Sequence, residues 1–160
     1  MESHEFFMQE ALLEARKALS KGEIPVGAVV VLHGEIISRG HNMRETLHDS
    51  TAHAEIIALR SAGEKLGTWR LNEAILYVTL EPCPMCAGAL LQARLDRVVY
   101  GADDPKAGAA GSLLNIPQFP GFNHFVKITG GVLAEEAVAL LQDFFQSRRN
   151  GKDDKSKKED

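Results

Sequence analysis

The stretch Pro82-Cys83-Pro84-Met85-Cys86 contains both cysteines of this 160-residue chain. If the residues from 84 onward are helical, Cys83 and Cys86 lie at the first turn and face the same way. A helix N-terminus carries partial positive charge and free N–H groups, which lower the pKa of a thiol and favour the metal-binding thiolate. Upstream, Thr51-Ala52-His53-Ala54-Glu55 supplies a histidine and a carboxylate. We therefore expect the two stretches to form one metal site.

The bulk composition is that of an ordinary globular domain. The chain is 44% hydrophobic and 25% charged, which is enough apolar material for a proper core. We expect residues 1–149 to form a single domain and residues 150–160 to form a charged, disordered tail. The net charge of −4 does not suggest a nucleic-acid surface, although a local basic patch is compatible with it. No signal peptide and no apolar run of membrane-spanning length is visible, so we expect a cytoplasmic protein without membrane contact.

Hydrophobic periodicity and turn residues predict alternating helices and strands. The expected helices are residues 3–21, 51–66, 84–94 and 134–147, and the expected strands are 26–32, 36–40, 75–80, 97–101 and 124–129. The second helix would be capped by Ser50 or Thr51 and would bury Ile56, Ile57, Leu59 and Ala62. This order implies an α/β fold in which a mixed five-stranded sheet carries helices on its faces.

The two candidate metal-binding stretches occupy equivalent places in this order. The helix bearing His53 follows strand 36–40, and the helix bearing the cysteines follows strand 75–80. If these strands run parallel, both helix N-termini lie at the same carboxyl edge of the sheet, where such folds place ligands. The spacing therefore favours convergence of His53 with Cys83 and Cys86.

Two thiolates and one imidazole are ligands suited to tetrahedral zinc. Three protein ligands leave a fourth position for water, as in catalytic sites; His41 or His48 could instead close the site and make it structural. Glu55 can reach past the helix end only because it lies in the first turn, where it could take a proton from water and return it to a leaving amine. The simplest reaction of this kind is hydrolytic deamination of an aromatic amidine such as adenine or cytosine.

The His53-Ala54-Glu55 and Pro82-Cys83-Pro84-Met85-Cys86 stretches resemble the signature of the cytidine-deaminase superfamily. The likeness extends from about residue 3 to residue 149 and is similar to the bacterial tRNA-specific adenosine deaminases in particular. The further matching stretches are Gly40-His41-Asn42, residues 78–83, residues 101–112, Asp143-Phe144-Phe145 and Arg148-Arg149. The resemblance implies a three-layer α-β-α, cytidine-deaminase-like fold.

The resemblance also implies a function and a set of site residues. The activity would be conversion of the wobble adenosine to inosine in the anticodon of tRNA, with arginine tRNA expected, by a homodimer holding one zinc ion (Zn2+) per subunit. The anticodon stem-loop would be the bound partner. The implied roles are zinc binding by His53, Cys83 and Cys86; proton transfer by Glu55; base binding by Asn42, Val26 and Ala54; and RNA contacts by Asp104, Lys106, Phe145 and Arg149.

Two other functions remain open at this stage. A deaminase of a free base or nucleoside, such as guanine or cytidine, would use the same zinc site and would suit the acidic charge balance. A non-catalytic, zinc-stabilised binding module would also keep the three ligands, but it predicts that Glu55→Gln leaves every measurable property intact. Residues 144 and 145 are both phenylalanine, and we expect one to pack in the core and the other to be freer.

Overall fold

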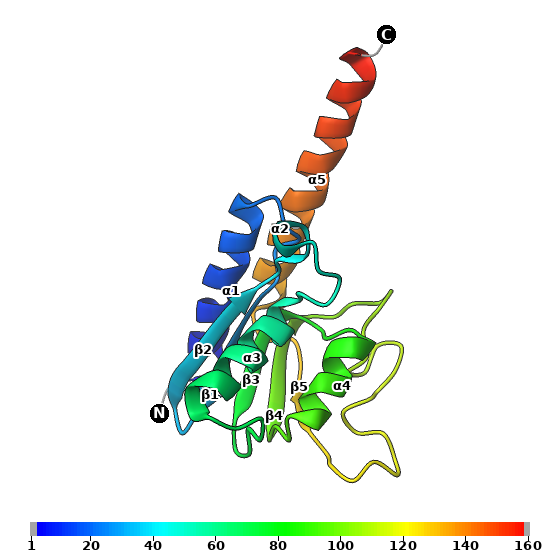
Figure 1. Cartoon of the computed structure of the whole chain (residues 1–160). Helices are drawn as coiled ribbons and strands as arrows, with labels where there is room; N and C mark the ends of the chain where they lie inside the picture. Colours follow the sequence, from blue (N-terminus) through cyan, green and yellow to red (C-terminus); the bar gives the residue numbers. More distant parts are fainter. Residues whose placement is uncertain (1–2, 159–160) are drawn as a thin grey trace.

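The computed structural model describes residues 3–158, and it describes side chains up to Arg149. Figure 1 shows a sheet with helices on its faces and a C-terminal helix that extends away from it. The helices are α1 (His4–Ser20), α2 (Arg44–Leu47), α3 (Ala54–Leu66), α4 (Pro84–Gln92) and α5 (Ala134–Lys158). The strands are β1 (Gly27–Leu32), β2 (Glu35–His41), β3 (Ile75–Leu80), β4 (Arg97–Ala102) and β5 (Lys127–Thr129).

The five strands form one mixed sheet in the order β2-β1-β3-β4-β5. Strand β1 pairs antiparallel with both β2 and β3, while β3, β4 and β5 pair in parallel. Because β2 and β3 both oppose β1, they point the same way. The predicted mixed sheet is confirmed, and α3 and α4 begin at the same edge of it.

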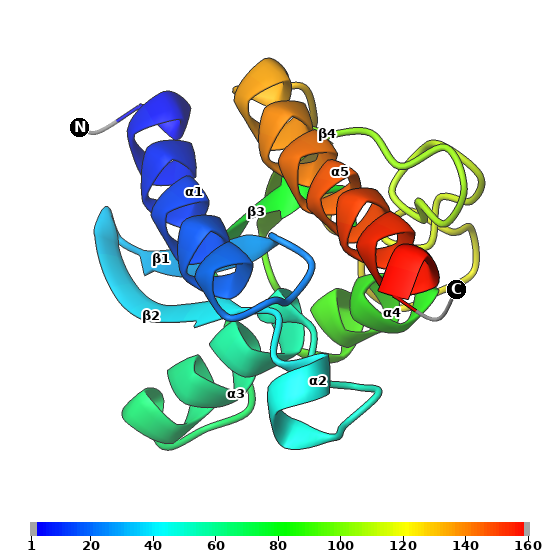
Figure 2. The same ribbon diagram turned by 90° about the horizontal axis from the view of Figure 1, so that it is seen from above.

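The helices form one layer on each face of the sheet. Figure 2 shows α1 and α5 on one face and α3 and α4 on the other. Alternate residues of each strand point to opposite faces, so Val29, Tyr77 and Val99 pack with α1. On the other face, Val30 and Val78 belong to the core cluster that includes α3. The predicted three-layer α-β-α architecture is therefore confirmed.

Gly40 lets α3 lie directly on the sheet. A Cβ at Gly40 would lie 2.6 Å from the carbonyl oxygen of Ala54 and 2.8 Å from the amide nitrogen of Ala58. The residues of α3 with no exposed surface are Ala54, Ala58 and Ala62, of which Ala62 was correctly predicted to be buried. The predicted apolar face was otherwise shifted, since Ile56, Ile57 and Leu59 are only partly buried. The close approach of α3 to β2 leaves no room for larger side chains between them.

The start of α3 also differs from the prediction. His53, rather than Ser50 or Thr51, is the N-cap residue. Thr51 instead donates from its backbone N–H and its hydroxyl to Oδ1 of Asp49, which closes a turn before the helix. Residues 41–50 lie outside the helices and strands that were expected, but they contain the single turn of α2.

The last helix was predicted to end at Ser147, but α5 continues to Lys158. Helix growth adds one backbone hydrogen bond for each further residue once a nucleus exists, so a polar extension can follow a packed segment. No change of secondary structure marks the predicted boundary after Arg149, and residues 159–160 lie outside the described residues. The extent of the domain stays a prediction.

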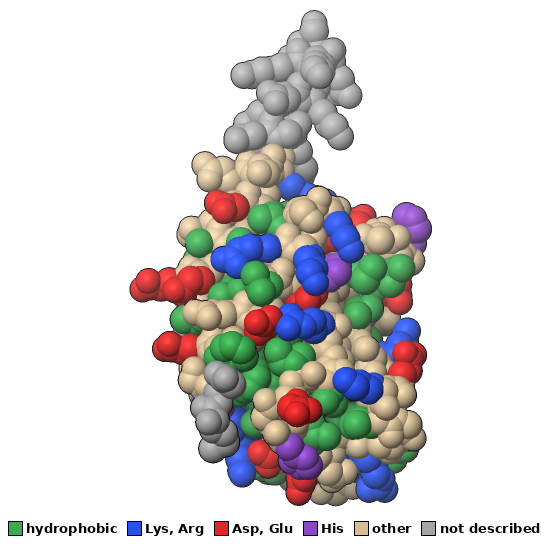
Figure 3. Space-filling view, turned by 90° about the vertical axis from the view of Figure 1, so that its left-hand side faces the viewer, with side chains coloured by type: hydrophobic (Ala, Val, Ile, Leu, Met, Phe, Trp, Pro, Cys, Tyr) green, Lys and Arg blue, Asp and Glu red, His purple; other side chains and the backbone are tan. Residues whose placement is uncertain are grey.

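One face of the described chain mixes charges of both signs. Figure 3 shows basic and acidic side chains interspersed on the side that lies to the left in Figure 1, with no continuous basic stripe.

None of the helices within residues 3–158 combines the length and the apolar character needed to cross a membrane.

Candidate metal centre and active site

His53, Cys83 and Cys86 come together at the edge of the sheet where α3 and α4 begin. His53 is the N-cap residue of α3, and Cys83 is the N-cap residue of α4. Pro84 follows at the start of α4, where its missing N–H costs nothing because that donor would have no helical partner. Cys86 lies in the first turn of α4 and is fully buried. The predicted convergence is confirmed.

The distances between these side chains suit a tetrahedral metal ion. The Nδ1 atom of His53 lies 3.6 Å from Sγ of Cys83 and 3.5 Å from Sγ of Cys86. Zinc bonds to sulfur are about 2.3 Å long and those to imidazole nitrogen about 2.0–2.1 Å, so two such ligands at a tetrahedral angle are about 3.6 Å apart. Within the described residues, His53, Cys83 and Cys86 form the group whose ligand atoms lie close enough together to hold a metal ion. The donor set and its spacing fit a divalent metal ion.

The electrostatics of the site also call for a cation. A hydrogen bond from the Cys86 thiol lowers the pKa of Cys83 to about 4, since this bond and one from His53 outweigh the opposing effect of burial. The pKa of Cys86 is raised, first by its bond to Cys83 and then by burial and by the charge of Glu55. The predicted depression of both thiol pKa values by the helix N-terminus is therefore wrong for Cys86. The thiolate of Cys83 is thus the anionic group that a bound cation would neutralise.

Glu55 lies in the first turn of α3 and is 4% exposed. Burial is the largest cause of its raised pKa, and the charge of Cys83 adds to it; a bond from its own backbone N–H and the charge of His53 oppose them. Glu55 does not belong to the group of candidate metal ligands among the described residues. It is thus a buried carboxylate next to the metal-binding group.

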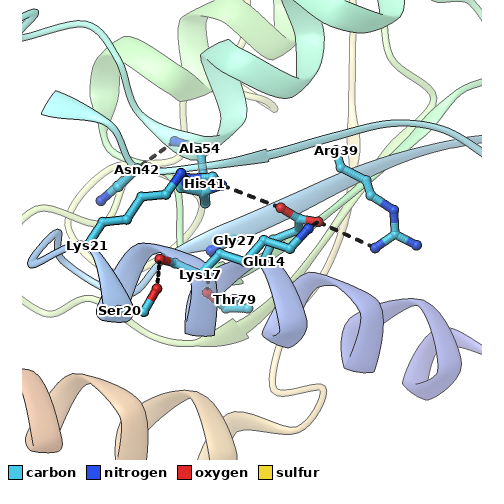
Figure 4. Close-up of polar contacts among 10 residues, drawn as sticks. All are labelled: Glu14, Lys17, Ser20, Lys21, Gly27, Arg39, His41, Asn42, Ala54 and Thr79. Atoms are coloured by element: carbon cyan, nitrogen blue, oxygen red, sulfur yellow. Dashed lines mark hydrogen bonds and ion pairs between the residues drawn. The ribbon is translucent and has the colours of Figure 1, made fainter. Parts of the chain in front are cut away.

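His41 and His48 do not join the metal-binding group within the described residues. His41 lies on the α1 side, with Nδ1 3.4 Å from the buried carboxylate of Glu14 and Nε2 3.1 Å from Nζ of Lys21 (Figure 4). Arg39 and Lys17 also contact Glu14. This network ties α1 to the end of β2, and His41 is therefore engaged away from the candidate metal centre.

Asn42 connects the end of β2 to the first turn of α3. Its side-chain oxygen accepts the Ala54 N–H at 2.9 Å, and Figure 4 shows the amide nitrogen pointing away from Ala54. Its backbone N–H donates to the carbonyl oxygen of Val26 at 3.1 Å. Val26, Asn42 and Ala54 are all buried. The three predicted base-binding residues are therefore mutual neighbours, and Asn42 keeps a donor group outside this pairing.

Asp104 and Lys106 lie on the loop that follows β4. Oδ1 of Asp104 accepts the backbone N–H groups of Lys106 and Ala107, at 3.0 and 3.1 Å. The backbone N–H of Asp104 in turn donates to Oε1 of Glu81 at 3.0 Å. This loop is thus attached through Glu81 to the segment that carries Cys83.

The middle of α5 faces a hollow that also receives Asn42. This hollow has a volume of about 240 Å³ and is lined by Gly22, Glu23, Ile24, Asn42, Arg44, Glu45, Phe144, Phe145 and Arg148. Phe145 is 47% exposed whereas Phe144 is 5% exposed. This confirms the prediction that one of the two rings packs in the core and the other is freer. Arg149 follows Arg148 in the chain, is exposed and does not line the hollow.

Sequence reasoning missed two buried carboxylates that organise loops around the site. Glu23 accepts the backbone N–H groups of Glu45 and Thr46, at 3.1 and 2.7 Å, and so holds the start of α2, where Arg44 lies. Glu81 holds the loop after β4. A single glutamate beside a turn or at a strand end gives no periodic signal, so only the folded arrangement reveals these contacts.

Comparisons with known proteins point to a deaminase. The sequence profile of the MafB19-like deaminase family matches residues 2–149. The chain is 53% identical over 152 residues to the tRNA-specific adenosine deaminase of Bacillus subtilis, covering 95% of this chain and 94% of the relative. A solved structure from studies of A-to-I editing by tRNA:A34 deaminases superposes with a TM-score of 0.82 at 47% identity, covering 85% of this chain and 99% of the other.

A more distant solved structure, a guanine deaminase from Nitrosomonas europaea, is 28% identical with a TM-score of 0.76 and covers 90% of this chain and 85% of the other. The same fold therefore occurs in deaminases of both kinds. High identity extends over nearly the whole of this chain and of its Bacillus subtilis relative. The sequence is therefore closer to the tRNA-specific adenosine deaminases than to the guanine deaminase. The chain belongs to the MafB19-like deaminase family and, within it, to the tRNA-specific adenosine deaminases.

Proposed function

We propose that this protein converts the wobble adenosine of a tRNA anticodon to inosine, with arginine tRNA as the expected substrate. The observation that carries the proposal is the group formed by His53, Cys83 and Cys86, with the buried Glu55 beside it at the carboxyl edge of the sheet. The relatives named tRNA-specific adenosine deaminases support the choice of substrate. Such a substrate implies a cytoplasmic protein.

The metal that suits two sulfur ligands and one imidazole is zinc, at one ion per subunit. Bound by His53, Cys83 and Cys86, zinc would supply Lewis acidity that lowers the pKa of a coordinated water. Glu55 accepts a proton from the attacking water and delivers it to a ring nitrogen of adenine; it then passes the second proton to the exocyclic amine. A C6–O bond forms, the C6–N bond breaks and ammonia leaves, so no oxidant or reductant is required.

The target base would be held by the residues at the end of β2 and the start of α3. The amide nitrogen of Asn42 is available to donate to the base, because its oxygen is occupied by the Ala54 N–H. Val26 and Ala54 offer buried apolar contact beside it. An adenosine within an anticodon must leave the base stack to reach such a position.

The neighbouring nucleotides would contact the two flanks of the site. Asp104 and Lys106 lie on the loop after β4, where a carboxylate oxygen can accept from a ribose 2′-OH and so favour RNA over DNA. Phe145 exposes an aromatic face for stacking, and Arg149 supplies a positive charge one turn further along α5. Local groups of this kind compensate for the overall charge of −4.

The decisive experiment offers the purified protein an arginine tRNA anticodon stem-loop and, separately, free adenosine, guanine and cytidine. We expect inosine at the wobble position only, scored by mass. Glu55→Gln should lower turnover on the order of 10²–10⁴-fold. Its bound metal should stay unchanged, because Glu55 lies outside the ligand group. The exposed Glu35→Gln is the matched control and should keep full activity.

The alternative is a deaminase of a free base, and the likeness to a guanine deaminase is the observation that favours it. Under this alternative the protein would turn over guanine rapidly, would ignore added tRNA and would leave the stem-loop untouched. That result would preserve the roles of His53, Cys83, Cys86 and Glu55. It would make Asp104, Lys106 and Arg149 ordinary surface residues.

We also propose that the protein is a homodimer. An apolar hollow of about 870 Å³ lies between α3 and α4, and its lining includes Leu59, Trp69 and Ala89. The loop after β4 exposes further large apolar side chains, namely Leu113, Leu114, Phe119, Phe122 and Phe125. Exposed apolar surface of this kind is typical of protein interfaces, and a second copy of the chain is the occupant that the family resemblance implies.

A further inference from the structure

Glu81 is a buried carboxylate that the proposed chemistry does not use. It lies between Leu80, the last residue of β3, and Pro82, and it is 2% exposed. Its two oxygens accept three backbone N–H groups at 3.0 Å, from Asp104, Ala110 and Ser112. The hydroxyl of Ser112 also donates to it. All four donor groups lie on the loop that follows β4, so the side chain of Glu81 holds both ends of residues 104–112.

The loop is folded closely around this carboxylate. A Cβ at Gly108 would lie 2.4 Å from Cδ and Oε2 of Glu81, so the loop approaches at a distance that only glycine allows. Two backbone bonds of 2.8 Å complete the arrangement: Gly108 N–H to the oxygen of Asp104, and Ala109 N–H to the oxygen of Pro82. The loop is therefore attached at several points to the strand end that leads into Cys83.

The ionised carboxylate suits this position for a simple chemical reason. All four contacts are donors, and a carboxylate accepts at both oxygens. A glutamine of the same shape has one accepting oxygen, and its amide nitrogen would face N–H groups. The replacement would therefore leave buried donors without acceptors, which is more costly than removing a balanced pair.

The loop carries the two side chains expected to contact RNA. Asp104 is held by Oε1 of Glu81 through its own N–H, and Oδ1 of Asp104 then accepts the N–H groups of Lys106 and Ala107. The chain of contacts runs from Glu81 to Asp104 and from Asp104 to the backbone of Lys106. A displacement of the Glu81 carboxylate would thus move both candidate RNA contacts together.

We propose that Glu81 is a positioning residue for substrate binding, which sets the loop of residues 104–112 against the RNA without touching it. The inference rests on the proposed function. Because Glu81 acts through the loop and not through the metal-binding side chains, its loss should weaken binding of the stem-loop and spare the chemical step. The target base itself is held elsewhere, by residues of β2 and α3.

The first test is Glu81→Gln assayed on the anticodon stem-loop. We expect KM to rise about tenfold or more, as for the loss of one or two charge-assisted hydrogen bonds, with kcat within about threefold of the original value. Bound metal per subunit should stay constant. Unchanged KM, or loss of metal together with kcat, would overturn the inference. A wild-type protein that leaves the stem-loop untouched would instead overturn the proposed function, and that result appears before any variant is compared.

A milder variant guards against misfolding of Glu81→Gln. Ser112→Ala removes a single donor to the carboxylate from an exposed position, so it should fold normally and raise KM in the same direction by a smaller factor. If KM does not move in this variant, the inference is contradicted even when Glu81→Gln cannot be purified.

Discussion

At the residue scale, we expect the adjacent Phe144 and Phe145 to have different roles. Phe144 should stabilise the fold, and Phe145 should bind the substrate. Phe144 is 5% exposed and carries the guanidinium of Arg148 at 5.0 Å from its ring centre, whereas Phe145 is 47% exposed. Phe144→Ala should lower the free energy of unfolding by about 3 kcal/mol. Phe145→Ala should change it by less than about 0.5 kcal/mol and yet raise KM for the stem-loop several-fold.

Urea unfolding and steady-state kinetics on the two variants would check this pair. The same chemical change at neighbouring positions makes each variant the control for the other. The assignment of Phe145 to the RNA surface would fail if Phe145→Ala left KM for the stem-loop unchanged.

At the scale of elements, the packing of α3 on β2 positions the first turn that carries the site. Gly40→Ala would push a methyl group against the carbonyl of Ala54, next to His53. We expect a loss of about 1–3 kcal/mol in the free energy of unfolding and a weaker hold on the metal. Gly88→Ala is the matched control, because its Cβ meets no atom within 4 Å. In a helix this change should stabilise the protein by up to about 1 kcal/mol.

Measurement of urea unfolding and of metal content after dialysis against a weak chelator would test both variants. Equal behaviour of Gly40→Ala and Gly88→Ala would contradict the view that the contact of α3 with β2 places His53.

The short helix α2 depends on Glu23, whose carboxylate accepts from Glu45 and Thr46. Burial raises the pKa of Glu23, but the hydrogen bonds from Thr46 and Glu45 outweigh it, so the pKa lies below its ordinary value of 4.5. A carboxyl whose pKa is depressed in the folded state stabilises the protein above its unfolded pKa and loses that contribution as pH falls. We therefore expect the stability difference between wild type and Glu23→Gln to shrink below about pH 4.5.

Thermal or urea unfolding of both proteins between about pH 3 and pH 7 would measure this difference, with the exposed Glu35→Gln as the reference variant. A gap that stays constant across this range would show that Glu23 does not stabilise α2 as a carboxylate.

At the scale of the whole molecule, the exposed apolar surface predicts self-association. Light scattering should give a mass near twice the 17.5 kDa of one chain. Trp69→Lys, which places a charge beside the hollow between α3 and α4, should shift the protein towards the monomer. Leu13→Lys is the control, because Leu13 is 47% exposed on α1, on the opposite face of the sheet. A monomeric wild-type protein would contradict the proposal.

Several features of the fold follow from local sequence. The strand 75–80 was predicted with the bounds that β3 has, and β3 is the middle strand of the sheet. The helix 51–66 was predicted to stop before Gly67. Gly67 does end α3, in a left-handed conformation with φ of 70°. Local sequence did not reveal the buried face of α3, because small residues at a close contact have no strong hydrophobic signal. It also overestimated β5, which has only the residues Lys127–Thr129.

The sequence by itself determined the identity of the candidate metal ligands and the deaminase chemistry, because the type and spacing of His53, Cys83 and Cys86 are a local chemical signature. Only the tertiary structure decided how Glu81 connects to the loop after β4 and how Glu23 connects to α2. It also decided that Phe144, rather than Phe145, is buried. These outcomes depend on which distant backbone donors and which packing surfaces the folded chain places beside each side chain, and no periodicity or spacing within a short segment specifies that.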